Sequence, residues 1–205
     1  MRVLPSLPCH IFTAVVGVIL LLGIGCHHGP VPKMSNEPIG KYEFGQSRAA
    51  LIAVEDEIRT ATPAQLETIE QRLLAVLESS DATYEAKDFA CRMLRQMGSP
   101  KSVPVLAELL YDENLSDMAR FGLQGLPFPE VDKAFRKALK ELNGDNRIGV
   151  IGSIAVRGDR KAVSQLARLA KSEDPALARA SIAALRRIGG EEASRALSSL
   201  NANNE

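Results

Sequence analysis

Side chains that could perform catalysis or hold a metal are scarce in most of this chain. The three histidines are His10, His27 and His28. The sequence after His28 therefore contains no histidine, which is the commonest general base and metal ligand. His27 and His28 are adjacent, but two ligands in a linker make a poor metal site. The sequence also lacks a paired-carboxylate pattern, a glycine-rich phosphate loop and a Ser-His-Asp arrangement. We therefore expect no metal, no cofactor and no catalytic centre.

The three cysteines fall into two groups. Cys9 and Cys26 lie near the N-terminus, and Cys91 is the single thiol of the following domain, which excludes a disulfide within that domain. In the repeat alignment described below, Cys91 falls on the same apolar stripe as Ile182, which predicts a small buried side chain with a structural role. A reactive Cys91 would instead favour an enzyme.

The N-terminal segment has the pattern of an export signal. Arg2 precedes an apolar run from Ile11 to Gly25 that contains Thr13 as its one polar member. A membrane-spanning helix needs about 20 apolar residues, whereas a signal-peptide core needs about 7 to 15. We therefore expect residues 1–25 to be a signal peptide; an uncleaved short anchor and a secreted or periplasmic protein are the alternatives.

The run ends in "GIGC", Gly23 to Cys26, which resembles the lipobox of bacterial lipoproteins. The resemblance implies lipidation of Cys26 and attachment to the bacterial cell membrane. The sequence departs from the family pattern at Gly23, where an aliphatic residue is expected, and Leu22 stands one place too early. The next residues, 26–46, are rich in Pro, Gly and polar residues and are interpreted as a tether.

Charge is distributed unevenly along a chain whose formal net charge is zero. Acidic residues exceed basic ones by five from His27 to Pro129, and basic residues exceed acidic ones by four from Glu130 to Glu205. This charge dipole is too weak for a nucleic-acid-binding protein. It permits one further hypothesis, the head-to-tail association of two copies.

An amphipathic segment recurs along the chain at a spacing of about 30 residues. Its apolar side chains repeat every three residues, as on the buried face of a helix, and a glycine follows three of the four copies. The copies are "KDFACRMLRQMG" (Lys87 to Gly98), "SDMARFGLQGL" (Ser116 to Leu126), "RIGVIGSIAVRG" (Arg147 to Gly158) and "ARASIAALRRIG" (Ala178 to Gly189).

A second type of helix precedes these segments, so the repeated unit is a helix pair. The segments "PKSVPVLAELLYDE" and "RKAVSQLARLAKSED" superpose with their valines and leucines in register. Pro100 and Pro175 are predicted in first helical turns behind the N-caps Ser99 and Asp174. The third unit is expected to break between its helices at Asn143 to Asn146. Upstream, helices are expected at Ser47 to Arg59 and at Thr62 to Ser80, the second with a capping box of Thr62 and Gln65. A final half-unit is expected at Glu191 to Leu200.

These alternating helices, with "A..AL..IG" endings, resemble HEAT repeats of the short bacterial type shared with phycobilin-lyase-like proteins. The resemblance covers roughly Thr62 to Leu200. It implies an all-α fold, a right-handed α-solenoid of about four helix pairs within a domain at residues 47–200, followed by a polar tail at 201–205. It also implies that the second helices line a concave surface that holds another macromolecule.

Arginines of the second helices are the candidate binding residues. Arg120 and Arg179 are interpreted as structural, because an Arg at this place in a HEAT unit often pairs with an Asp of the preceding turn, here Asp112 and Asp174. A solvated face is the alternative for the rest. The glycines of the third copy, Gly149 and Gly152, are predicted to let a neighbouring helix approach. The candidate partner-binding residues are Arg92, Arg95, Arg186 and Arg187. Their partner would be an acidic protein, an anionic headgroup or a glycan.

Together these patterns predict a non-catalytic scaffold or adaptor at the bacterial cell envelope that binds a protein partner and no nucleic acid. An accessory subunit or lyase-like enzyme of the phycobilin-lyase-like type is one alternative. A purely structural spacer is the other.

Overall fold

The computed structural model describes residues 39–201, which belong to one compact unit. The predicted signal peptide, Cys26 and residues 202–205 of the tail lie outside the described residues. Within 39–201 the chain is helical and contains no strand. The α-helices are α1 (Ala49–Thr60), α2 (Pro63–Glu78), α3 (Tyr84–Met97), α4 (Ser102–Glu108), α5 (Ser116–Gly125), α6 (Pro129–Glu141), α7 (Gly144–Arg157), α8 (Val163–Leu169), α9 (Pro175–Ile188) and α10 (Gly190–Asn201), with 3-10 helices η1 (Ile39–Lys41), η2 (Leu109–Tyr111) and η3 (Arg160–Ala162).

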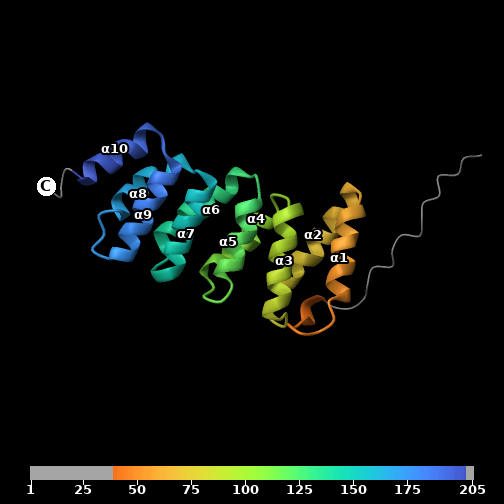
Figure 1. Cartoon of the computed structure of the whole chain (residues 1–205). Coiled ribbons are helices and arrows are strands. Elements are labelled where there is room, and N and C mark those ends of the chain that lie inside the picture. Colours follow the sequence, from red (N-terminus) through yellow and green to blue (C-terminus); the bar gives the residue numbers. More distant parts are fainter. Residues whose placement is uncertain (1–38, 202–205) are drawn as a thin grey trace, which may run out of the picture. The chain divides into compact units, whose positions relative to one another are not determined.

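The helices alternate between two layers. Layer A comprises α2, α4, α6, α8 and α10, and layer B comprises α1, α3, α5, α7 and α9. Each helix of layer B packs against the next one in that layer, and α2–α3, α4–α5, α6–α7 and α8–α9 pack as pairs. Figure 1 shows α3, α5, α7 and α9 side by side in chain order. This arrangement confirms the predicted α-solenoid of four helix pairs, with α1 and α10 as half-units at the two ends of the described residues.

The core lies between the layers and repeats with the helices. Each complete pair contributes at least one fully buried aliphatic side chain from each layer, and burying one such side chain stabilises the fold by about 1.5–3 kcal/mol. In layer A these are Leu73, Leu106, Leu139 and Leu166; in layer B they are Leu94, Leu123, Ile154 and Leu185.

The predicted helix starts are correct in two places and wrong in two others. Asp174 caps α9 by accepting from the Ala176 N–H at 2.8 Å, and the Thr62 and Gln65 capping box is present at α2. Pro100, however, precedes α4 in a turn, because α4 begins only at Ser102. The predicted break at 143–146 is too long, since α7 already begins at Gly144.

The predicted tether ends too late. Ile39 of η1 is buried in the core, and the Thr83 N–H at the start of α3 donates to Gly40 O at 2.9 Å. Lys41 Nζ donates to Asp81 O at 3.0 Å. The packed unit therefore includes residues that the composition of the segment assigned to a linker.

Polar side chains join consecutive repeats. Glu70 of α2 is buried and accepts from the Ser99 N–H at 2.7 Å and from Ser102 Oγ at 2.5 Å, which ties α2 to the start of α4. Arg136 of α6 likewise pairs with the buried Asp159 carboxylate before η3. Such contacts satisfy buried polar groups and fix each pair against the next. None of the helices in residues 39–201 is long and apolar enough to span a membrane.

Candidate protein-binding surface on layer B

Arg92 and Arg95 both lie on α3 but differ in what they contact. Arg92 is exposed and pairs at 2.8 Å with Asp88, one turn earlier on the same helix. Arg95 extends to α5, where its Nη1 donates to Phe121 O at 2.6 Å and its guanidinium lies 4.3 Å from the Phe121 ring centroid. This is cation–π geometry, and Gly125 makes room for the Arg95 side chain. Arg95 therefore joins two repeats, a role that the sequence pattern did not indicate.

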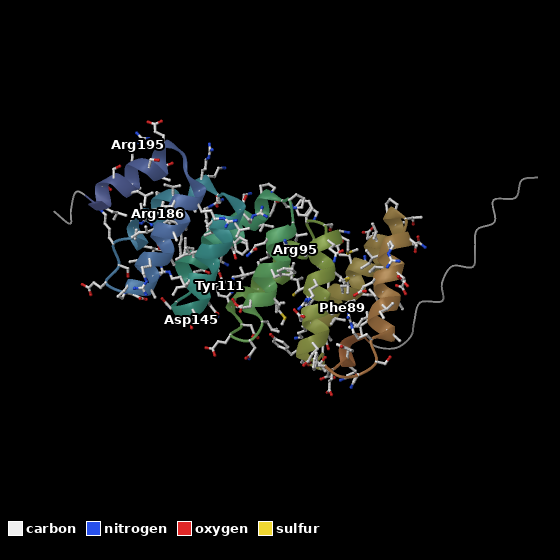
Figure 2. All side chains as sticks on the ribbon, in the orientation of Figure 1. Phe89, Arg95, Tyr111, Asp145, Arg186 and Arg195 are labelled. Carbon is white, nitrogen blue, oxygen red and sulfur yellow. The ribbon has the colours of Figure 1, made fainter. Side chains whose placement is uncertain are left out.

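Arg186 and Arg187 lie at the last turn of α9 and are exposed. In the repeat alignment Arg186 corresponds to Arg95, but layer B has no further described helix beyond α9 for it to reach (Figure 2). Neither residue has an ion pair within residues 39–201. Because α9 contains no acidic residue, its three arginines form a local positive patch.

The predicted pairs of Arg120 with Asp112 and of Arg179 with Asp174 are both wrong. Arg120 pairs with Asp117 on its own helix and donates to Gly149 O at 3.3 Å. Asp112 instead accepts from backbone N–H groups of the turn before α5, and Asp174 accepts from the first N–H groups of α9 as its N-cap. Arg179 is exposed and has no ion pair in the described part of the chain, so it joins Arg186 and Arg187 in the patch on α9.

Most of the exposed large apolar side chains also lie on layer B. Six large hydrophobic side chains are exposed within residues 39–201, and four of them lie on layer B helices. Exposed apolar groups next to charged ones are typical of protein interaction surfaces. The four are Ile52 on α1, Tyr84 on α3, Phe121 on α5 and Val156 on α7.

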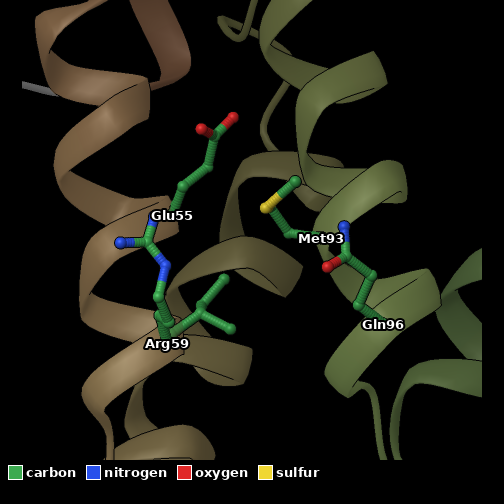
Figure 3. A pocket seen from close by; sticks show the side chains of 5 residues that line it. Glu55, Arg59, Met93 and Gln96 are labelled. Atoms are coloured by element: carbon green, nitrogen blue, oxygen red, sulfur yellow. The ribbon is translucent and has the colours of Figure 1, made fainter.

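A pocket of about 360 Å³ lies between α1 and α3 (Figure 3). Ile58 and Met93 provide apolar wall, and Gln96 provides an amide group. The two charged lining residues already have partners, since Glu55 pairs with Arg48 at 3.5 Å and Arg59 pairs with Asp56 at 2.7 Å. The pocket is therefore lined by apolar and polar side chains together. The pocket was not predictable from the sequence, because its residues come from two helices about 35 positions apart.

Cys91 is fully buried in the core, as the apolar stripe predicted. Burial disfavours the thiolate and raises the pKa of Cys91 to about 12, with a smaller contribution in the same direction from the Asp88 charge. Among the described residues, no three His, Cys, Asp or Glu side chains gather closely enough to hold a metal ion.

Comparison with known proteins bears on the repeats. No curated protein matches the sequence. A family model described as HEAT repeats matches residues 133–205, which run from within α6 through α10 in the structure. The match and the paired packing of these helices support HEAT repeats in this part of the chain.

Proposed function

We propose that layer B is a protein-binding surface and that the chain works as a non-catalytic scaffold. The observation that carries the proposal is the combination, on one layer, of exposed apolar side chains with arginines that have no ion pair in the described residues. HEAT repeats commonly serve as protein-interaction scaffolds, and the match to their model supports the proposal. The position of Arg179, Arg186 and Arg187 on α9 implies a partner with an acidic segment.

The four candidate arginines differ in how well they are placed to contact a partner. Arg186 and Arg187 are better placed to contact a partner than Arg95, because Arg95 already binds Phe121 O and its ring. Arg92 keeps an exposed guanidinium although it pairs with Asp88. All four residues remain candidates for partner binding.

The test is site-specific photo-cross-linking in intact cells. A photoreactive amino acid at Val156, on layer B, is combined with the wild-type chain or with an α9 variant that carries Arg179→Glu, Arg186→Glu and Arg187→Glu. We expect a discrete cross-linked protein with the wild type and its loss with the α9 variant.

The matched control is an α6 variant that carries Lys133→Glu, Lys137→Glu and Lys140→Glu. It makes the same change in net charge, but on layer A. It should retain the cross-link at Val156. Equal retention by the wild type and both variants would instead favour a purely structural spacer.

We further propose that the chain is exported and anchored by lipid on Cys26 at the bacterial cell envelope. The apolar run before Cys26 and the small residues that precede it support this proposal. Incorporation of labelled palmitate into the wild type, and none into a Cys26→Ser variant, is the expected result. Incorporation into both would contradict it. The head-to-tail association of two copies stays a prediction, and equal sedimentation coefficients at low and high ionic strength would contradict it.

A further inference from the structure

Three lysines form a stripe along the outer side of α6. Lys133, Lys137 and Lys140 are spaced by one turn each and are all exposed. The opposite side of α6 carries Val131 and Phe135, which are fully buried in the core. The lysines therefore point away from the solenoid, because residues three or four positions apart share one face of a helix.

The next helix of layer A also carries exposed cations. Lys161, Arg168 and Lys171 lie in or next to α8 and are exposed. The two helices are linked directly, since Gln165 Nε2 on α8 donates to Arg136 O on α6 at 3.4 Å. We call the six cations Lys133, Lys137, Lys140, Lys161, Arg168 and Lys171 the basic face.

The basic face is not neutralised by the described residues. None of its six side chains forms an ion pair within 39–201. Glu130 and Glu173 lie at its margins, and the Glu141 carboxylate accepts from the Tyr111 hydroxyl. The same layer is different in the first half of the chain, where Glu67 pairs with Lys101 at 2.5 Å. Positive charge is therefore concentrated on α6 and α8.

We propose that the basic face binds the anionic phospholipid headgroups of a membrane surface. Clustered lysines and arginines are attracted to anionic bilayers, and each added cation strengthens this attraction. A lipid surface requires no fixed geometry from its partner, which suits flexible lysines that have no ordered contacts.

Two observations favour lipid over a protein partner. None of the exposed large hydrophobic side chains in the described residues lies on α6 or α8, whereas protein interfaces are built around apolar and aromatic anchors. Lysine is also depleted at protein interfaces. The basic face thus differs in kind from layer B, where exposed apolar side chains accompany the arginines.

The proposal gains from the lipid anchor proposed above. Residues 26–38 connect the apolar run to Ile39, and a chain of this length reaches at most about 45 Å even when fully extended. An anchored domain would therefore stay close to the bilayer, where even a weak attraction acts at high effective concentration. Lipid binding by the basic face does not depend on the protein partner of layer B.

The experiment measures binding of the full-length chain to vesicles of phosphatidylcholine alone and of phosphatidylcholine with phosphatidylglycerol. The apolar N-terminal run is present in every variant, so its contribution is removed by comparing the two vesicle types. For the wild type we expect the affinity for anionic vesicles to exceed that for neutral ones by about tenfold or more, and to fall at high salt.

The two charge-reversal variants separate the faces. The α6 variant should lose the preference for anionic vesicles, and the α9 variant, with the same charge change on layer B, should retain most of it. A second α6 variant with glutamine at all three positions should also lose it, which guards against a folding defect of the glutamate variant. Equal loss in the α6 and α9 variants would show a net-charge effect and overturn the proposal.

Two other results would also overturn it. One is an unchanged vesicle preference in both α6 variants. The other is binding to duplex DNA, sensitive to the α6 substitutions, without any preference for anionic vesicles. Because cross-linking at Val156 reports on layer B alone, failure of the lipid proposal and failure of the protein-binding proposal give different results.

Discussion

At the scale of single residues, the reactivity of the Cys91 thiol tests the lyase-like alternative. Its thiol is fully buried, and burial raises its pKa to about 12, so the protonated form dominates at any pH below that value. Since only the thiolate attacks electrophiles, we expect iodoacetamide to leave Cys91 unmodified in the folded chain at pH 8. Peptide-resolved mass spectrometry distinguishes Cys91 from Cys9 and Cys26, and unfolding in guanidinium should restore labelling. Rapid labelling of the folded chain would favour the lyase-like alternative.

Arg157 is a second residue whose environment decides its role. Its Nη1 donates to Leu126 O at 2.7 Å and its guanidinium pairs with Asp132, so α7 is tied to the turn between α5 and α6. The side chain is only 13% exposed. We expect Arg157→Ala to lower the free energy of unfolding by about 2–4 kcal/mol, because Asp132 and the carbonyl groups lose their donor.

Urea unfolding followed by circular dichroism measures this change. The control is Arg168→Ala, an exposed arginine without an ion pair in the described residues, which should change the free energy of unfolding by less than about 0.5 kcal/mol. Equal effects of the two substitutions would mean that the Arg157 contacts contribute nothing to stability.

Arginine partners are also where sequence reasoning failed. The pattern placed Arg95, Arg120 and Arg179 on the second helices, but it could not say which group each guanidinium would reach. Arg95 binds a carbonyl and a ring on α5, and Arg120 binds a carbonyl on α7. A long arginine side chain can reach several backbone carbonyl groups of the next repeat. The spacing of apolar residues does not predict which of them it binds.

At the scale of helices, the sequence predicted which helices exist and in what order they follow one another. It predicted the residues at which they begin and end less well. The buried positions Leu94 and Leu185 were found because apolar spacing follows directly from burial. Pro100 was misplaced because a turn, with the Ser102 N–H donating to Ser99 O at 3.0 Å, precedes the helix. The packing of Ile39 was missed because a single buried residue in a polar segment produces no periodic signal.

The glycines of α7 give a paired prediction on helix packing. A methyl group on Gly149 would lie 2.5 Å from Arg120 Cζ, whereas one on Gly152 would meet nothing within 4 Å. The neighbouring helix α5 therefore does approach closely at Gly149, through the side chain of Arg120. The same prediction is wrong for Gly152. We expect Gly152→Ala to raise the free energy of unfolding by about 0.5–1 kcal/mol, because alanine has the higher helix propensity.

Gly149→Ala should show no such gain, since the added methyl group displaces the guanidinium that donates to Gly149 O. The same urea titration serves for both variants, and a Gly149→Ala, Arg120→Ala double variant removes the obstructing side chain. Equal stabilisation by the two single substitutions would mean that Arg120 moves away at no cost.

At the scale of the whole described unit, stability should vary along the stack. In a solenoid each repeat contacts only its neighbours, so an end repeat loses the interface that an inner repeat has on both sides. Here α1 and α10 are the end helices of residues 39–201, while α3, α5 and α7 each pack between two helices of layer B. The exposed residues of α10, such as Glu192 and Ser198, are polar, as is typical of a helix that caps a stack.

We therefore expect hydrogen exchange followed by mass spectrometry to show a gradient. Amides of α1 and α10 should exchange fastest, and those of α5 and α7 slowest, because opening an end helix breaks one interface and opening an inner helix breaks two. Arg157→Ala should accelerate exchange in α5, α6 and α7 before it affects α3, since its contacts join only those helices. Uniform protection from α1 to α10 would contradict nearest-neighbour stability, because it would require the whole stack to open as a single cooperative unit.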